Sequence, residues 1–216
     1  MAPIVIFQQN REWVLCQKPA GVLSQSGKPE EETMVTLLER QLGGEVYPVH
    51  RLDREVGGVM VYARTQTAAA ALSRLVQQGT MTKEYLAVVR GCPERDAGVL
   101  EDLLFHDQRN NKSYVVKRER KGVKKARLSY RVLARAGEAS LVQVRLFTGR
   151  THQIRVQFAS RGMPLLGDAR YGGGSGKLAL WSVRLRFPWK GERVCQVCLP
   201  EELGDFAELP GLAEME

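Results

Sequence analysis

The segment 47–65 constrains the fold more than any other part of the chain, because two apolar runs enter and leave a short charged turn. Strands that flank such a turn would present its residues on a loop held by rigid elements, at a sheet edge or cleft. Asp53 lies in this turn between Arg51 and Arg54, and a nearby guanidinium favours the ionised carboxylate. The paired glycines that end the turn permit a close approach of backbone or ligand. By itself, the four-residue pattern H-R-L-D favours an ordinary solvated surface turn.

Short apolar and alternating segments predict strands over much of the remaining chain. Helices are expected at 30–42, at 67–78 and from Thr151, a plausible N-cap, to about Gly162. Residues 93–100 are expected to form a loop. The many strands, short connections and few helices predict an α+β fold on a largely antiparallel or mixed sheet. The strands are expected at 4–7, 13–17, 46–49, 59–63, 81–91, 128–134, 140–147, 178–187 and 193–199.

The formal net charge of the 216-residue chain is +8, and it is unevenly distributed. Residues 200–216 hold six acidic side chains and no basic one, which leaves 32 basic and 18 acidic side chains, a formal +14, before them. Solubility alone needs less charge, so this basic body favours a polyanion such as nucleic acid as partner. No stretch approaches the ~20 apolar residues of a membrane span, and the N-terminus does not resemble a secretory signal. We therefore expect a cytoplasmic protein without membrane contact.

The cysteines do not predict a metal site. Cys195 and Cys198 have the spacing of metal ligands, but a zinc site needs a second pair of ligands. No second C-x-x-C pattern occurs, and the three histidines are scattered. A strand with small apolar residues explains this segment better, so no metal is expected.

The segment 117–127 is the most basic part of the chain, with seven basic residues and one acidic residue. Its glycine and its lack of apolar periodicity predict a flexible loop or hairpin tip. A solvated charge run is a common explanation, and in a basic protein a surface that contacts phosphate is about equally well supported. The candidate contacts are Lys121, Lys124 and Lys125. If this run is only solvated surface, the basic groove would lie elsewhere, around Arg150, Arg161 and Arg170.

Three further positions have two interpretations each. Lys18 is either a phosphate contact or a solvated strand end. Tyr85 is either a half-buried strand residue or a stacking platform for a base. Arg155 shares a helix face with Thr151, four residues earlier, and from there it either reaches a partner carboxylate or faces solvent.

Five local patterns stand in order along the chain and closely resemble the RluA-type pseudouridine synthases over roughly residues 4–200. One departure is visible, because Val56-Gly57-Gly58 stands where the family usually has T-S-G. The resemblance implies a single catalytic domain over 1–200 without an S4-like RNA-binding domain, followed by an acidic tail over 201–216. The patterns are K-P-A-G-V from Lys18, H-R-L-D from His50, K-E-Y-L-A-V-V-R-G from Lys83, G-R-T-H-Q-I-R-V from Gly149 and P-L-L-G-D-A-R-Y-G from Pro164.

The resemblance implies that a uridine in rRNA or tRNA is detached from N1, rotated and rejoined through C5, without redox cofactor, ATP or metal. Asp53 would be the catalytic carboxylate, acting as nucleophile at the sugar or the base, or as base on the sugar. Arg155 would pair with Asp53 and keep it ionised. Tyr85 would stack on the uracil and support proton transfer at C5. Arg51 would fill the space left by the extruded nucleotide or hold that nucleotide, and Leu166 would line the base pocket.

Two other classes of function remain open. A non-catalytic RNA-binding or ribosome-associated protein would keep the fold, but the intact Asp53, Tyr85 and Arg155 favour catalysis. A base-excising DNA glycosylase also flips bases and uses an aspartate, but nothing resembles its helix-hairpin-helix elements. His50 and His152, which lie beside the motifs, are interpreted as structural. We expect a monomer whose partner is RNA.

Overall fold

A computed structural model describes residues 2–200 except 27 and 29, so the expected acidic tail lies outside the described residues. Three helices and eleven strands form in this part of the chain, which confirms the α+β fold. The described residues divide into two compact units, each considered by itself below. The first unit holds residues 2–82 and 182–200, and the second holds residues 83–181. No described helix is long and apolar enough to cross a membrane.

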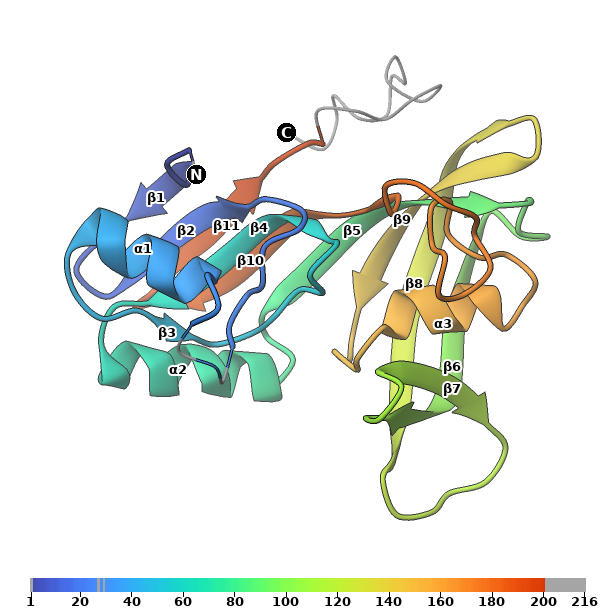
Figure 1. Cartoon of the computed structure of the whole chain (residues 1–216), viewed down its shortest axis with the longest axis horizontal. Coiled ribbons are helices and arrows are strands. Elements are labelled where there is room, and N and C mark those ends of the chain that lie inside the picture. The colour runs from blue at the N-terminus through green and yellow to red at the C-terminus, as the bar shows by residue number, and fades with distance from the viewer. Residues whose placement is uncertain (1, 27, 29, 201–216) are drawn as a thin grey trace. The chain divides into compact units, whose positions relative to one another are not determined.

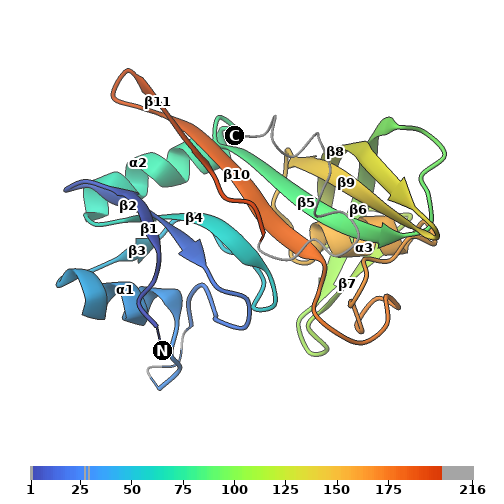
Figure 2. The same cartoon turned by 90° about the horizontal axis from the view of Figure 1, so that it is seen from above.

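The first unit is built on strands that are mostly antiparallel neighbours. β4 (Gly57–Ala63) lies between β2 (Trp13–Lys18) and β10 (Leu180–Trp189), and β1 (Ile6–Gln9) pairs with β2. The two short additions are β3 (Tyr47–Pro48), which pairs with β4, and β11 (Glu192–Val197), which pairs with β10. All seven residues of β4 are buried, because helices cover both faces of these strands (Figure 2). Such double coverage explains why the sequence of β4 is continuously apolar rather than alternating.

The two helices of this unit begin at side-chain caps. α1 (Met34–Leu42) begins after Thr33, whose hydroxyl accepts from the backbone N–H of Thr36 in a capping box. The expected start at residue 30 is therefore wrong, because the cap fixes the first turn later in the chain. α2 (Gln66–Gln77) begins after Thr65, as predicted within one residue. Its Leu72 is fully buried in the core that also holds Trp13.

The second unit holds an antiparallel sheet in the order β5-β9-β8-β6-β7, with α3 packed against it (Figure 1). The expected loop at 93–100 is wrong for its last four residues, because β6 already begins at Ala97 and pairs there with β8. An exposed Val99 and a glycine disturb the alternation at this point, so the sequence shows no strand period. The strands are β5 (Thr82–Arg90), β6 (Ala97–Asp107), β7 (Lys112–Val116), β8 (Val123–Ala136) and β9 (Ala139–Leu146).

α3 (Gln153–Ala159) begins in an unexpected way. Its N-cap is His152, which has a left-handed backbone (φ 54°) and makes no side-chain cap. Thr151 was the predicted N-cap, and this prediction is wrong because the helix starts one residue later. The carbonyl of Thr151 instead accepts a hydrogen bond from the Ser113 hydroxyl at 2.6 Å. Tertiary contacts rather than local capping therefore set where α3 begins.

Candidate active site

The turn that carries Asp53 lies between β3 and β4, as the two flanking apolar runs predicted. Asp53 is partly exposed and Arg51 is exposed, whereas Leu52 between them is buried. The Ser24 hydroxyl, itself buried, accepts from the Leu52 N–H at 3.0 Å and donates to the Leu52 carbonyl at 2.9 Å. The backbone directly before Asp53 is therefore fixed by one buried side chain.

Lys18 fixes the same turn from the other side, and the prediction that it contacts phosphate or solvent is wrong. Its side chain is 0% exposed, and Nζ donates to the carbonyls of Pro19, Arg54 and Val56 at 2.9, 3.1 and 2.7 Å. Three carbonyl acceptors match the three N–H donors of an ammonium group. Burial lowers the pKa of Lys18 to about 8, an effect that the charge of Asp53 opposes. The group is therefore still protonated at neutral pH.

The departure from T-S-G does not leave this turn without support. The Val56 N–H donates to the Asp53 carbonyl at 3.1 Å, and the Gly21 N–H donates to the Arg54 carbonyl at 2.8 Å. Arg54 Nε in turn donates to the Gly21 carbonyl at 2.9 Å. None of these hydrogen bonds needs a hydroxyl at 56–58, so backbone groups and Lys18 hold the turn.

Gly58 confirms the predicted close approach of backbone at the paired glycines. Its φ is +118°, and a Cβ added there would lie 2.1 Å from the carbonyl oxygen of Ser182. The Ser182 hydroxyl donates to the Val59 carbonyl at 3.0 Å. His50 Nε2 accepts from the Val61 N–H at 3.2 Å, which agrees with its structural interpretation. These contacts tie the end of the turn to its own unit.

In the second unit, Tyr85 lies in β5 opposite Val144 of β9 and is only 5% exposed. Leu166 is half-buried, and its N–H donates to the Val88 carbonyl of β5 at 2.9 Å. Lys83 points to the same face of β5 as Tyr85 because side chains alternate along a strand, and burial lowers the pKa of Lys83. β5 therefore carries the aromatic candidate, and Leu166 lies directly beside that strand.

Arg155 reaches a partner carboxylate rather than facing solvent, and the partner within its unit is Asp168. Arg155 Nε donates to Asp168 Oδ2 at 2.7 Å and Nη2 donates to Oδ1 at 2.8 Å, with exposed side-chain fractions of 5% and 0%. Sequence reasoning missed Asp168, although its G-D-A-R-Y-G motif was noted. A carboxylate in such a motif is a candidate partner for an arginine, but only the tertiary structure decides which arginine it meets. The predicted pairing of Arg155 with Asp53 stays a prediction.

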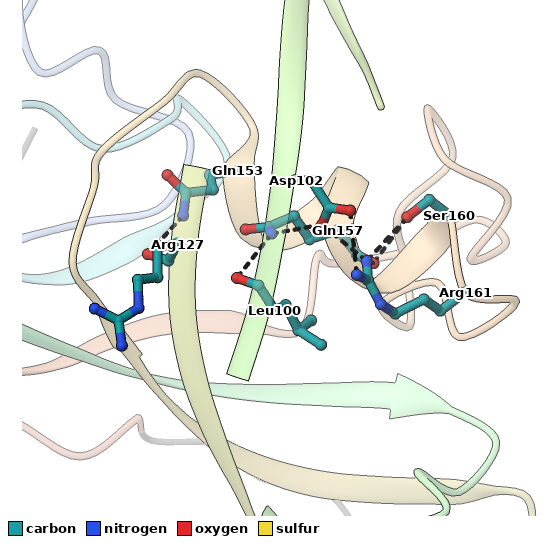
Figure 3. Close-up of polar contacts among 7 residues, drawn as sticks. All are labelled: Leu100, Asp102, Arg127, Gln153, Gln157, Ser160 and Arg161. Carbon is teal, nitrogen blue, oxygen red and sulfur yellow. Dashed lines mark hydrogen bonds and ion pairs between the residues drawn. The ribbon is translucent and has the colours of Figure 1, made fainter. Parts of the chain in front are cut away.

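The helix that carries Arg155 is held on the sheet by polar contacts at both ends (Figure 3). At its start, Gln153 Nε2 donates to the Arg127 carbonyl at 3.1 Å. Near its end, Gln157 Nε2 donates to Asp102 Oδ2 at 2.7 Å, and Arg161 Nη1 donates to the same oxygen at 2.9 Å. These contacts leave α3 little freedom to slide along β6 and β8.

The basic segment is only partly a loop. Lys121 lies in the exposed connection after β7, but Lys124 and Lys125 are exposed residues of β8. The expectation of a loop or hairpin tip is therefore wrong from 123 onward, where pairing with β6 overrides the weak local pattern. Arg150 Nε donates to the Lys125 carbonyl at 2.9 Å. Arg150 and this basic strand therefore lie side by side.

The candidates fall into two groups. Asp53, Arg51 and Lys18 belong to the first unit, whereas Tyr85, Arg155, Leu166, Arg150 and the basic lysines belong to the second. No group of three or more His, Cys, Asp or Glu side chains within the described residues could hold a metal ion. Cys195 lies in β11, as the strand interpretation of this segment predicted.

Solved structures define the fold. A structure titled Human RNA Pseudouridylate Synthase Domain Containing 4 matches with a TM-score of 0.76 and 24% identity, covering 91% of this chain and 89% of the other. A second, Human RNA Pseudouridylate Synthase Domain Containing 1, matches with a TM-score of 0.77 and 23% identity, covering 91% and 83%. The fold is thus that of pseudouridylate synthases.

A family profile described as RNA pseudouridylate synthase matches residues 12–160. An uncharacterized RNA pseudouridine synthase of Aquifex aeolicus is 37% identical in an alignment of 181 residues that covers 79% of this chain and 56% of the relative. The ribosomal large subunit pseudouridine synthase D of Borreliella burgdorferi is 32% identical in an alignment of 187 residues that covers 82% of this chain and 57% of the relative. The chain belongs to the RNA pseudouridylate synthase family, in agreement with the five motifs, and it spans about half the length of these relatives.

Proposed function

We propose that the protein isomerises specific uridines in structured RNA, in stem-loops of rRNA or tRNA, to pseudouridine. The bond between N1 and the sugar breaks, the base rotates, and a new bond joins C5 to the same sugar carbon. C5 loses its hydrogen as a proton and N1 takes up a proton, so the product has the same composition as the uridine. Family membership supports this reaction, and relatives carry the names of ribosomal large subunit and tRNA pseudouridine synthases. RNA of these kinds leads us to expect a cytoplasmic protein, and we expect it to act as a monomer.

The observation that carries the proposal is the way in which the turn of Asp53 is held. Burying an ammonium group costs free energy unless its hydrogen bonds are satisfied. Lys18 is buried, and its ammonium group donates to carbonyls of its own neighbour and of this turn. An ordinary solvated turn has no need of such support, whereas a carboxylate that must meet one atom of a bound nucleotide does. The geometry therefore supports Asp53 as the reacting carboxylate.

The other candidates take the roles that the family resemblance implies. Arg155 pairs with Asp53 during the reaction, and Tyr85 stacks on the uracil once the base has left its own stack. Arg51, exposed beside Asp53, contacts the extruded nucleotide, and Leu166 lines the base pocket. The basic side chains of the second unit, Arg150 and the exposed lysines at 121, 124 and 125, contact phosphate.

The test compares Asp53→Asn with Glu55→Gln. Both changes remove one negative charge from the same turn, and Glu55 is exposed. RNA labelled with tritium at uridine C5, from cells that lack the gene, is incubated with each variant. We expect tritium release by the wild type and by Glu55→Gln, and none by Asp53→Asn, with RNA affinity changed little in both.

Turnover near the wild-type rate in Asp53→Asn would refute the assignment of the carboxylate. Tight binding of rRNA or tRNA by the wild type without any tritium release would instead favour the non-catalytic RNA-binding protein. Mapping pseudouridine in rRNA and tRNA from cells with and without the gene then identifies the modified position.

A further inference from the structure

Arg155 is held in its plane by one carboxylate. Guanidinium and carboxylate groups that share two parallel hydrogen bonds are fixed in a common plane, which adds orientation to attraction. The pair of Arg155 and Asp168 has this form, with Nε and Nη2 each bound to a different oxygen at 2.7 and 2.8 Å. An arginine has five N–H donors, so three of them lie outside this pair.

Tyr171 restrains the same guanidinium from its face. The centre of the Tyr171 ring lies 5.4 Å from Cζ of Arg155, within the range of a cation–π contact. The Tyr171 hydroxyl accepts from the Ser113 N–H of β7 at 2.8 Å and lies 3.0 Å from Nδ1 of His152. Burial raises the pKa of Tyr171, so the hydroxyl keeps its proton. Through its hydroxyl, Tyr171 therefore contacts both β7 and His152, the N-cap residue of α3.

The loop that supplies Asp168 and Tyr171 is closely packed. The Gly173 N–H donates to the Asp168 carbonyl at 2.8 Å, and the Gly167 N–H donates to the Gly173 carbonyl at 3.0 Å. A Cβ added at Gly173 would lie 1.7 Å from the Leu165 carbonyl oxygen, and one at Gly167 would lie 1.9 Å from that of Lys177. Such contacts leave the loop no room to relax, so Asp168 and Tyr171 have fixed positions.

Stability alone does not explain this arrangement. A buried ion pair contributes little or nothing to folding stability compared with apolar side chains of the same volume. The carboxylate of Asp168 also neutralises the guanidinium charge locally, which weakens Arg155 as a bare positive charge. The pair instead fixes the orientation of the guanidinium, so the three remaining N–H donors of Arg155 point in fixed directions.

We propose that Asp168 and Tyr171 are positioning residues for Arg155, which fix its guanidinium in one plane so that its remaining N–H groups meet the reacting groups in a single orientation. This inference rests on the proposed isomerase function, in which Arg155 acts at the reaction centre. Asp168 acts by its two hydrogen bonds, and Tyr171 acts by its ring and its hydroxyl. Neither residue needs to touch the RNA.

The kinetic test is a double-mutant cycle between Asp168→Asn and Arg155→Lys. Misplacement by about 1 Å can cost on the order of 100-fold in rate, so we expect Asp168→Asn to lower kcat by about that factor with KM changed less than about threefold. In the Arg155→Lys background the same change should lower kcat by less than about threefold, because residues that act as a unit are not additive. If Asp168→Asn lowers kcat by the same factor in both backgrounds, the two residues act independently and the proposal is overturned.

Stability controls separate positioning from a folding defect. Asp96→Asn removes an exposed carboxylate of the same unit, which binds Arg135 at 2.6 Å, and kcat should stay within about threefold. In Arg155→Met/Asp168→Leu both charges are gone, so the melting temperature lost in Asp168→Asn should return while kcat stays at or below that of Asp168→Asn. A double variant that regains activity along with stability would show that the pair is only structural.

A spectroscopic measurement keeps this inference distinct from the proposed function. The Nε–H resonance of Arg155, assigned by its loss in Arg155→Lys, should exchange slowly with solvent in the wild type and in Asp96→Asn. It should shift and exchange fast in Asp168→Asn, and Tyr171→Phe should show an intermediate rate. If the wild type releases no tritium from any RNA, the isomerase function fails, whereas an Nε–H resonance that is unchanged in Asp168→Asn refutes the positioning role in either case.

Discussion

Replacement of Lys18 by Met tests how the turn of Asp53 is held. The change leaves the carbonyls of Pro19 and Val56 without their ammonium donor, while the Arg54 carbonyl keeps the Gly21 N–H. A buried acceptor that loses its partner costs about 1–3 kcal/mol, so two such acceptors cost roughly 2–6 kcal/mol. Against this, a lysine pKa of about 8 instead of 10.5 means that burial of the charge costs the wild type about 3 kcal/mol. The two contributions leave a net change at pH 7 between a gain of about 1 kcal/mol and a loss of about 3 kcal/mol in the free energy of unfolding of Lys18→Met.

The pH dependence of this difference has a definite sign. Between about pH 8 and 10.5 the unfolded Lys18 still binds a proton while the folded one has released it. Stability rises with pH wherever the unfolded state binds more protons. The wild type should therefore gain stability relative to Lys18→Met over this window, by at most about 3 kcal/mol. The carbonyl acceptors favour the charged form and reduce the gain.

The measurement is urea unfolding of both proteins at pH 7, 8, 9 and 10, with Lys28→Met as control. Lys28 is an exposed lysine of the same unit, so its replacement removes the same charge without touching the turn. Tritium release from uridine-labelled RNA, measured at a temperature where both proteins are folded, should also be slower in Lys18→Met, because the turn of Asp53 has lost its support. If the stability difference between Lys18→Met and the wild type does not change between pH 8 and 10, the reasoning about Lys18 is refuted.

Three further predictions concern the ring, the phosphate contacts and the glycine turn. Tyr85→Phe keeps the ring and should bind RNA normally but turn over poorly, and full activity would show that the hydroxyl has no chemical role. Replacing Lys121, Lys124 and Lys125 by alanine should weaken the binding of all RNAs similarly. It should also flatten the salt dependence of binding by up to roughly 0.7–0.9 log units per lost contact. An unchanged slope in salt titrations would mean that these lysines are only a solvated surface. Gly58→Ala should lower the free energy of unfolding by about 2–4 kcal/mol, because positive φ and a clash with Ser182 add. Gly44→Ala, with φ +127° and open space around its Cβ, should lose only the backbone part, so equal losses in denaturant unfolding would contradict the clash.

The sequence by itself determined the elements whose pattern is local. The apolar runs on either side of the Asp53 turn predicted β3 and β4, and the alanine- and leucine-rich segment predicted α2 within one residue. The five motifs indicated the family, which the profile match over residues 12–160 confirmed. Apolar periodicity, turn chemistry and motif order are all properties of neighbouring residues, so they can be recognised in a single sequence.

Only the tertiary structure decided which distant groups meet. Lys18 was predicted at the surface because lysine is rarely buried, yet three carbonyls, two of them 36 and 38 residues away, satisfy its ammonium group inside the protein. Arg155 could reach a carboxylate or face solvent, and the fold of the glycine-rich loop brought Asp168 to it. α3 begins only after His152, because a contact from β7 fixes the carbonyl of Thr151. Long-range contacts of this kind leave no local period in a sequence, because the residues of a loop do not specify which distant residues the loop will contact in the fold.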